Sequence, residues 1–327
     1  MQRMRTGKEL ILATKPFTKE SKGLSWYYTI STLILLCGSI VTALLIEETI
    51  VRTLASLFAG LVMVRFFVIY HDHQHGAILS KSSVATIVFK LFGVLILAPS
   101  SIWKRSHDYH HNHNSKLFSA SIGSYPIMTR EKFLKSTPSE KRSYLATRHP
   151  LTIFFGYFSM FLVGMCVQSF SSSPKRHWDS LVALILHFSL QFIVFYFLGW
   201  EAWLFGIIIP FILADMIGAY LFYAQHNFPG VTFREKEGWT YHHAALESSS
   251  YMKMNFFWNW VTANIGYHHI HHMNSRIPFY RLPEVMKSIP ELQNARETSL
   301  SIKDIVACFR LKVWDPERNK MISLKEI

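Results

Sequence analysis

The sequence has little cysteine, and its cysteines are dispersed. Cys37, Cys166 and Cys308 are odd in number and far apart, so they predict neither a disulfide framework nor a cysteine metal site. No flavin or nicotinamide fingerprint occurs, and the only His-Pro pair, at residues 149–150, lacks the glycines of a cytochrome b5 haem motif. Repeats, low-complexity tracts and flexible linkers are also missing, which predicts a single domain over residues 1–327.

Acidic residues are scarce as well. The chain has 21 Asp and Glu against 34 Lys and Arg, which gives a net charge of +13. A charge of this sign is compatible with nucleic-acid binding or with basic loops that face anionic lipid. The basic residues are scattered among apolar segments and form no nucleic-acid-binding motif. The sequence therefore favours the lipid alternative and predicts no nucleic-acid partner.

Long apolar blocks are plentiful. Hydrophobic residues make up 50% of the chain and come in blocks, which predicts an integral membrane protein. Residues 26–45 carry no charge, and residues 54–70 contain only Arg65. Basic residues dominate before the first block and two glutamates lie in the connector, so the N-terminus is predicted to be cytoplasmic. The first block is too long, and too much polar chain precedes it, for a cleavable signal.

Histidine is concentrated in three short windows. Of 17 histidines, eleven fall in "HDHQH" at 71–75, "HDYHHNH" at 107–113 and "HHIHH" at 268–272. Spacings of three and four residues would place each set on one face of a helix. The eight periodic histidines are His71, His75, His107, His110, His111, His268, His271 and His272.

Eight imidazoles are more than one metal ion would use. Tetrahedral zinc takes four ligands, so the number predicts two octahedral ions, and imidazole suits iron, copper, nickel and zinc alike. His226, in "YAQHNFPG", is a ninth predicted ligand. Asp72 and Asp108 each follow the first histidine of a window and could accept the other ring N–H of a ligand. Solvated loop positions remain the alternative for both aspartates.

The remaining histidines are expected to have other roles. His73, His113 and His269 lie in the windows but off the periodic faces, where supporting or solvent-facing positions are expected. For both His242 and His243, a supporting role and a surface position remain alternatives. Plain structural roles are expected for the isolated His149, His177 and His187.

The three windows resemble the histidine boxes of the integral-membrane fatty-acid desaturases. The family patterns HxxxH, HxxHH and HxxHH occur in order as "HDHQH", "HDYHH" and "HHIHH". The stretch "NIGYHHIHHMNSRIPFYRL" is similar to the acyl-lipid branch related to Δ12 (omega-6) enzymes, and "WTYHHAALESSSYMKM" extends the likeness upstream. The resemblance covers roughly residues 62–282. Asn264, which opens the third-box stretch, is predicted to support the ligands.

The resemblance implies an oxygen-dependent, di-iron dehydrogenation that introduces a cis double bond into a lipid-linked acyl chain. Two irons are the implied cofactors and dioxygen the co-substrate. A separate ferredoxin or cytochrome b5 is the implied electron donor, docking at the basic cytoplasmic face. A histidine-box hydroxylase or ketolase acting on alkanes or carotenoids is the nearer alternative, and a metal transporter is the more distant one.

Two positions depart from the commoner family pattern. The first box reads "HDHQHG", where many relatives of the Δ12 type have a cysteine and a glycine between the outer histidines. In the acyl-CoA branch an asparagine four residues before the lone histidine helps to hold a metal-bound water, whereas Phe222 occupies that position here. The second departure favours an acyl-lipid over an acyl-CoA substrate.

All boxes must share one side of the membrane to meet at one centre, so the chain must cross an even number of times between them. Residues 181–198 and 203–223 are expected to form the second hairpin, because Lys175 and Arg176 precede it and only Glu201 lies in its connector. The predicted fold is therefore all-α, with four transmembrane helices in two hairpins and a cytoplasmic histidine-rich cap that holds two metals.

Two apolar stretches are then left without a full crossing. Residues 84–98 and 151–170 are predicted to be interfacial or re-entrant, and Gly156 and Gly164 would ease a bend in the second. The alternative is that residues 151–170 span and one later block does not.

Overall fold

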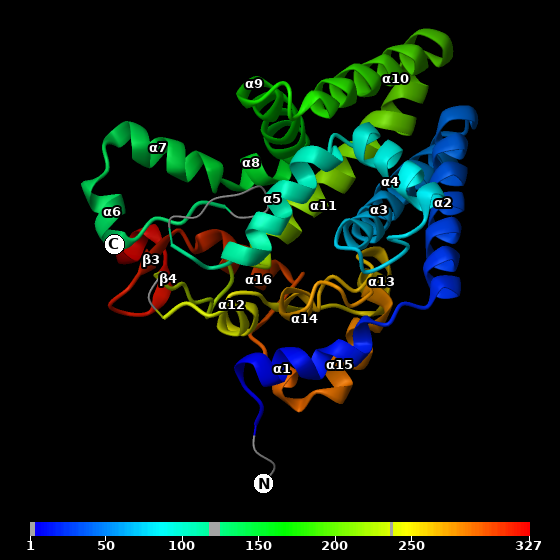
Figure 1. Ribbon diagram of the computed structural model, residues 1–327. Coiled ribbons are helices and arrows are strands. Elements are labelled where there is room, and N and C mark those ends of the chain that lie inside the picture. The colour runs from blue at the N-terminus through cyan, green and yellow to red at the C-terminus, as the bar shows by residue number, and fades with distance from the viewer. Residues whose placement is uncertain (1–3, 118–124, 236–237) are drawn as a thin grey trace.

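A computed structural model describes residues 4–117, 125–235 and 238–327 (Figure 1). The chain is mostly helical, and it also contains two small two-stranded sheets that the all-α prediction did not include. Strand β1 (Tyr251–Lys253) pairs in parallel with β2 (Glu297–Ser299), and β3 (Val313–Asp315) pairs antiparallel with β4 (Lys320–Ile322). With only three residues in each strand, these sheets tie down the C-terminal region and leave the helical architecture unchanged.

The helices follow one another along the chain. Their bounds are α1 (Gly7–Thr14), η1 (Lys15–Thr18), α2 (Lys22–Leu45), α3 (Thr49–Gln74), α4 (Ser83–Leu95), α5 (Ser100–His113), α6 (Arg130–Lys135), α7 (Pro138–Thr147), α8 (Pro150–Phe154), η2 (Tyr157–Gln168), α9 (Ser169–Ser172), α10 (Trp178–Trp203), η3 (Leu204–Ile208), α11 (Ile209–Ala224), α12 (Tyr241–Glu247), α13 (Phe256–Val261), α14 (His268–Met273), η4 (Phe279–Arg281), α15 (Leu282–Ser288), η5 (Pro290–Asn294), α16 (Ile302–Arg310) and η6 (Leu324–Glu326).

Helices α2 and α3 form the first predicted hairpin. The buried face of α2 consists mainly of small residues such as Ser25, Thr32 and Ala43, whereas its exposed face carries large apolar ones such as Ile34 and Leu45. Small residues let neighbouring helices approach closely in a membrane, where large apolar side chains can face lipid. This inside-out pattern is the one expected of a membrane helix. Helix α3 lies deeper and is the more buried of the two.

The second hairpin is made by α10 and α11. The apolar helical stretch Trp178–Ala224 has 47 residues, which as one straight helix would be about 70 Å long, more than twice a hydrocarbon core. The chain turns back near Gly199, whose φ of +86° interrupts the helix, and returns through η3 into α11 (Figure 1). Phe192 and Phe197 are among the large side chains exposed on α10. Three long apolar helices occur in the described ranges, or four if the α4–α5 pair counts as one.

The two stretches predicted not to cross are both broken. Helices α4 and α5 meet at an angle of 92°. Residues 151–170 are divided among α8, η2 and α9. Gly156 serves close packing in this second stretch: a Cβ there would lie 2.5 Å from the Cβ of Ala219 and 2.8 Å from the carbonyl oxygen of Asp215. It is helical, with φ −53°, so its part is to let this segment lie against α11.

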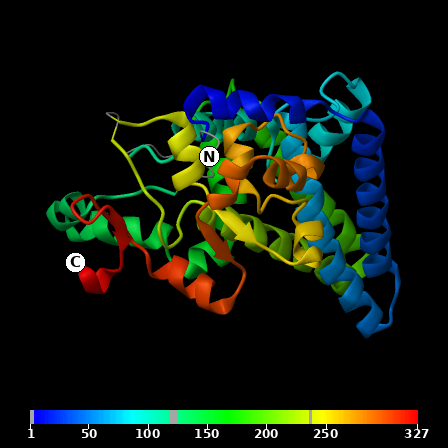
Figure 2. The ribbon, with the colours of Figure 1, turned by 90° about the horizontal axis from the view of Figure 1, so that it is seen from below.

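The remaining elements close over one end of the long helices. In Figure 1, α1, α12, α14 and α15 lie at the end of the molecule opposite the α10–α11 turn, and Figure 2 views the molecule from that end. Arg5 joins the N-terminal segment to this layer through a two-pronged ion pair with Glu291, with both N–O distances 2.8 Å. The last turns of α3 and α5 and the end of α11 meet α14 on the inner side of this layer. The histidines lie at this junction.

Candidate metal centre

Each histidine box occupies the last turns of a helix or a short helix of its own. His71 lies in the last turn of α3 with His75 as its C-cap, and His107, His110 and His111 lie in the last two turns of α5. The third box forms the six-residue helix α14. His226 follows α11 directly. Helix ends let four separate segments approach one point without a clash between their backbones.

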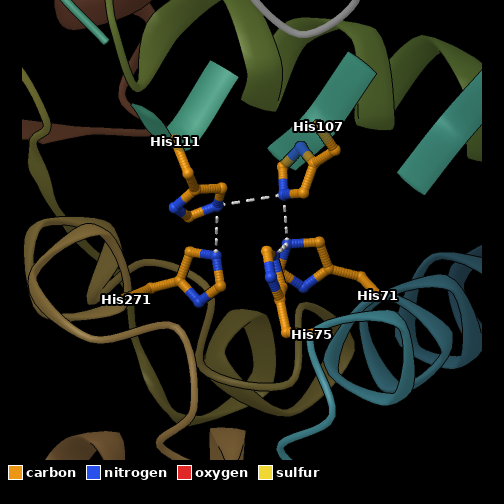
Figure 3. Close-up of side chains that lie close together, drawn as sticks. All are labelled: His71, His75, His107, His111 and His271. Atoms are coloured by element: carbon orange, nitrogen blue, oxygen red, sulfur yellow. Dashed lines mark hydrogen bonds between the residues drawn. The ribbon is translucent and has the colours of Figure 1, made fainter. Parts of the chain in front are cut away.

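Five imidazoles form the first group. Its members are His71, His75, His107, His111 and His271. Figure 3 shows their rings converging from α3, α5 and α14. The Nε2 atoms of His71 and His107 lie 2.8 Å apart, and those of His271 and His111 lie 3.1 Å apart. One ligand atom from each residue lies within 4.8 Å of all the others.

Four imidazoles form the second group. Its members are His110, His226, His268 and His272, and their ligand atoms also lie within 4.8 Å of one another. The Nε2 atom of His226 is 3.0 Å from that of His110 and 2.9 Å from that of His268. All four residues are buried. The structure thus brings together the nine predicted residues and divides them five to four.

Backbone and carboxylate groups lie against two of these rings. The Nδ1–H of His226 donates to the carbonyl oxygen of Ser248 at 2.8 Å, which leaves Nε2 with its lone pair directed into the second group. Asp72 lies with Oδ1 3.4 Å from Nδ1 of His71, and its Oδ2 accepts from the backbone N–H of Phe279. The first arrangement matches the outer contacts that fix a metal-binding histidine. The second is a close approach only, because His71 Nδ1 has no hydrogen-bond partner among the described residues.

Burial favours the neutral form of His226 and of the third-box ligands. It lowers the pKa of His226 to about 4, against the opposing hydrogen bond to Ser248. Burial, reinforced by repulsion from neighbouring imidazoles, places the pKa values of His268, His271 and His272 well below the ordinary range of histidine. A neutral imidazole exposes a lone pair, and imidazoles that converge in this way bring several nitrogen ligands to one place. The residues present therefore fit two metal ions that accept imidazole nitrogen.

The off-face histidines of the boxes point elsewhere. His269 is fully buried, and its Nε2–H donates to the carbonyl oxygen of Leu292 at 3.0 Å. His73 contacts the carbonyl of Ile78, and His113 contacts that of Tyr109. None of the three belongs to either group of close ligand atoms among the described residues.

The isolated histidines have structural contacts. His187 lies between the Tyr157 hydroxyl and the Leu95 carbonyl, at 2.8 Å from each. His177 contacts the Ser101 hydroxyl at 2.8 Å. His149 caps α8. His242 and His243 lie at the surface of α12.

Two residues predicted to support the ligands are directed away from them. Asp108 pairs with Lys104 at 3.0 Å, one helical turn earlier on the solvent side of α5. Asn264, with φ +60°, donates to the carbonyl of Phe279 at 3.2 Å and so shapes the turn before α14. A role for either in metal binding stays a prediction.

A narrow apolar cavity runs from the histidines toward the long helices. His71, His107 and His268 line one end, and Met63 lines it eight residues before His71 on α3, about 12 Å along the helix axis. Phe222 contributes to its wall. Asp215 is the acidic exception: it is 4% exposed, and its Oδ2 has no hydrogen-bond partner among the described residues. This shape suits a chain of methylene groups lying against the metal centre.

Two residues near the site were not predicted from the sequence. Trp103 stacks on His107 with ring centres 4.8 Å apart, yet it reads as one more aromatic in an apolar chain. Arg148, in the unremarked "TRHP", is fully buried beside Asn227, the residue after His226. Only the first of these could have been inferred, from its position four residues before His107.

The chain matches known proteins over most of its length. Residues 48–301 match the family model described as "Fatty acid desaturase". A "Fatty acid desaturase" of Bacillus subtilis (strain 168) is 28% identical over 86% of this chain and 80% of the relative. A chloroplastic omega-6 fatty acid desaturase of Spinacia oleracea is 23% identical over 73% of this chain, which spans 53% of that relative. An "sn-1 oleoyl-lipid 12-desaturase" of Anabaena variabilis is 23% identical over 73% of this chain and 68% of the relative.

Proposed function

The chain belongs to the fatty acid desaturase family, and on that premise we propose that it introduces a cis double bond into the acyl chain of a membrane lipid. It is an oxidoreductase and a membrane protein. The proposed requirements are two irons, dioxygen and electrons from a separate carrier protein. The single observation that carries the proposal is the five-and-four division of nine imidazoles, eight of them buried, three of which line one end of an apolar cavity.

The nine histidines are the proposed iron ligands. His71, His75, His107, His111 and His271 would hold one ion, and His110, His226, His268 and His272 the other. The bound irons would supply the oxidising power, drawn from dioxygen, that removal of two hydrogens from unactivated methylenes requires. The chain holds the imidazole nitrogen ligands in fixed orientations, as the contact of His226 with Ser248 illustrates.

The apolar cavity supplies position and excludes water. An acyl chain lying along α3 and α11 would pass His71, His107 and His268, so that one carbon pair faces the centre. Holding the reacting carbons in a fixed place replaces a chance encounter with an intramolecular one. Apart from the three histidines, Gln225 and Asp215, the walls are apolar and offer little to bind water. The depth of the cavity would select which bond reacts.

A lipid-linked substrate is proposed on two grounds. The Anabaena relative is named as acting on an oleoyl lipid. Phe222, four residues before His226, has no atom that could hold a metal-bound water, and it lines the cavity. At this position the acyl-CoA branch is expected to have an asparagine.

The proposed topology places the histidines at the cytoplasmic side. Helices α2, α3, α10 and α11 would cross the membrane, and the layer formed by α1, α12, α14 and α15 would face the cytoplasm. Basic side chains such as Arg105 and Arg176 lie exposed between α5 and α10. A ferredoxin or cytochrome b5 type of donor, whose surfaces are acidic, would be steered to such a face.

The test is to express the chain in a host whose lipids are saturated or monounsaturated and to locate new double bonds by mass spectrometry. A new cis double bond at one position is expected, and the variant His268→Ala should form none. A hydroxyl group in its place would support the hydroxylase alternative, which the comparisons do not favour. Purified protein given only NAD(P)H and oxygen should not turn over until a reductase and a carrier protein are added.

A further inference from the structure

A second, polar pocket lies on the other side of the metal centre. It reaches His226 of the second histidine group, and Asn114, Ser115, Lys116, Arg148 and Asn227 contribute polar side chains to its lining. No carboxylate lines it among the described residues. Its contents are therefore expected to be rich in hydrogen-bond acceptors and to carry no positive charge.

Arg148 is the fully buried cation of this polar pocket. Its guanidinium is fully buried and donates to Asn227 Oδ1 at 2.6 Å and to the carbonyl oxygen of Pro126 at 3.0 Å. Its Nε has no hydrogen-bond partner, and no ion pair compensates its charge within the described residues. A buried cation is costly unless an opposite charge or enough acceptors surround it. Arg148 also lies over the rings of Tyr144 and Tyr223 and makes a longer bond, 3.4 Å, to the carbonyl oxygen of Leu311. Its Nε is thus left for a group that the described part of the chain does not supply.

The surroundings add to the positive charge. Lys312 donates to the backbone carbonyl of Arg148 at 2.6 Å, and burial together with the Arg148 charge lowers the pKa of this lysine to about 8. The hydroxyl of Ser115, buried in the lining of the pocket, also has no partner in the described part of the chain. Two unpaired polar atoms in one small pocket indicate a ligand that brings oxygen atoms.

The polar pocket and the apolar cavity share one lining side chain. Phe222 lines both, and the histidines of the second group lie between them: His268 faces the cavity and His226 the pocket, with their Nε2 atoms 2.9 Å apart. A single amphipathic molecule could therefore place an apolar tail in one and a polar end in the other while passing the metal centre.

We propose that Arg148 binds an oxygen acceptor at the polar end of the acyl-lipid substrate, either the ester carbonyl or the phosphate, and so fixes the distance from that end to the metal centre. This inference rests on the proposed function. Arg148 acts here as a positioning and specificity residue. It makes the position of the new double bond depend on the number of carbons counted from the carboxyl end.

The test measures binding of lipid probes to the full chain in detergent, by energy transfer from tryptophan to a conjugated polyene. Three probes carry the same polyene chain: a phosphatidylcholine, a diacylglycerol and a hydrocarbon without any ester. Replacing Arg148 by Gln should weaken binding of an ester-bearing probe about 10- to 100-fold, as expected for loss of a charged hydrogen bond. The hydrocarbon probe should bind Arg148→Gln as tightly as it binds the unchanged protein.

A second variant guards against a folding defect in Arg148→Gln. Ser115→Asp keeps Arg148 and its contacts but adds a carboxylate to the same pocket, where it would compete with the ligand. The Ser115 backbone has φ +62°, a conformation that Asp tolerates better than most residues. Matched controls are Arg142→Gln and Ser143→Asp, which make the same charge changes at exposed positions of α7.

The outcomes separate the two sources of the oxygen. Weaker binding of both ester-bearing probes assigns the carbonyl, and weaker binding of phosphatidylcholine alone assigns the phosphate. Unchanged binding of all probes, or equal weakening of the hydrocarbon, overturns the proposal and leaves Arg148 a structural anchor. Failure of the proposed function would be distinct, because the unchanged protein would then form no double bond in the host.

Discussion

The sharpest test of the metal centre compares two histidines two residues apart on the same short helix. His271 belongs to the five-membered group, with Nε2 3.1 Å from that of His111. His269 is equally buried, but its Nε2–H is committed to the carbonyl of Leu292. Replacing each by Gln removes an imidazole of the same burial from α14, so the two variants differ chiefly in whether a proposed ligand is lost.

The expected effects differ in kind. Loss of an outer contact to a metal ligand already lowers metal affinity 10- to 100-fold, so His271→Gln should lower it by at least about 100-fold, or about 2.7 kcal/mol. His269→Gln should retain iron, because Gln can still donate toward Leu292. If that bond fails, the buried carbonyl is left unpaired, at a cost of about 1–3 kcal/mol in unfolding free energy.

The assay measures iron per chain by mass spectrometry of the purified protein, together with double bonds formed in the expression host. We expect His271→Gln to lose iron and activity, and His269→Gln to keep about two irons and measurable activity. Iron content and double-bond formation at the unchanged level in His271→Gln would refute the ligand assignment. Equal loss in both variants would show that folding of α14, and not ligation, controls the result.

Three further expectations follow from packing, topology and charge. Gly156→Ala should lower the free energy of unfolding by about 1–3 kcal/mol through overpacking against α11, whereas Gly38→Ala, with open space around its Cβ, should be neutral or stabilising; equal effects in denaturant titrations would contradict this reasoning. In a Cys37→Ser background, Ser172→Cys should react with a membrane-impermeant thiol reagent only from the cytoplasmic side, and labelling from the opposite side would reverse the proposed topology. Lys312 has a folded pKa of about 8, below its ordinary value of about 10.4, so between these values the unfolded chain binds a proton that the folded chain does not. Stability should therefore rise with pH across that window relative to Lys312→Met, and identical slopes in the two proteins would show that this lysine titrates normally.

The helical periodicity of the boxes selected eight of the nine histidines, and the ninth, His226, was chosen as the isolated histidine in "YAQHNFPG". Spacings of three and four residues put each set on one helical face, and the structure brings those residues together. The same rule excluded His269, which the structure directs to Leu292. Local spacing determines such faces because side-chain direction in a helix repeats along the chain.

Other features escaped because several neighbours, near or remote in the sequence, are available to the same side chain. Asp108 follows the same pattern as Asp72 beside a box histidine, yet it pairs with Lys104 while Asp72 contacts His71. Gly156 was expected to ease a bend, but its role is set by Ala219 on a helix more than 60 residues away. The sequence alone cannot decide which neighbour a side chain will meet.

By itself the sequence determined the helical character, the apolar blocks and the set of imidazoles, because each of these depends on composition and short-range periodicity. Only the tertiary structure decided how the nine histidines divide into groups of five and four, and that Phe222 separates an apolar cavity from a polar pocket. It also decided that Arg148 is buried, with its Nε unpaired among the described residues. These features arise where the ends of α3, α5 and α11 meet α14, and the angles at which helices pack are set by contacts across the whole chain.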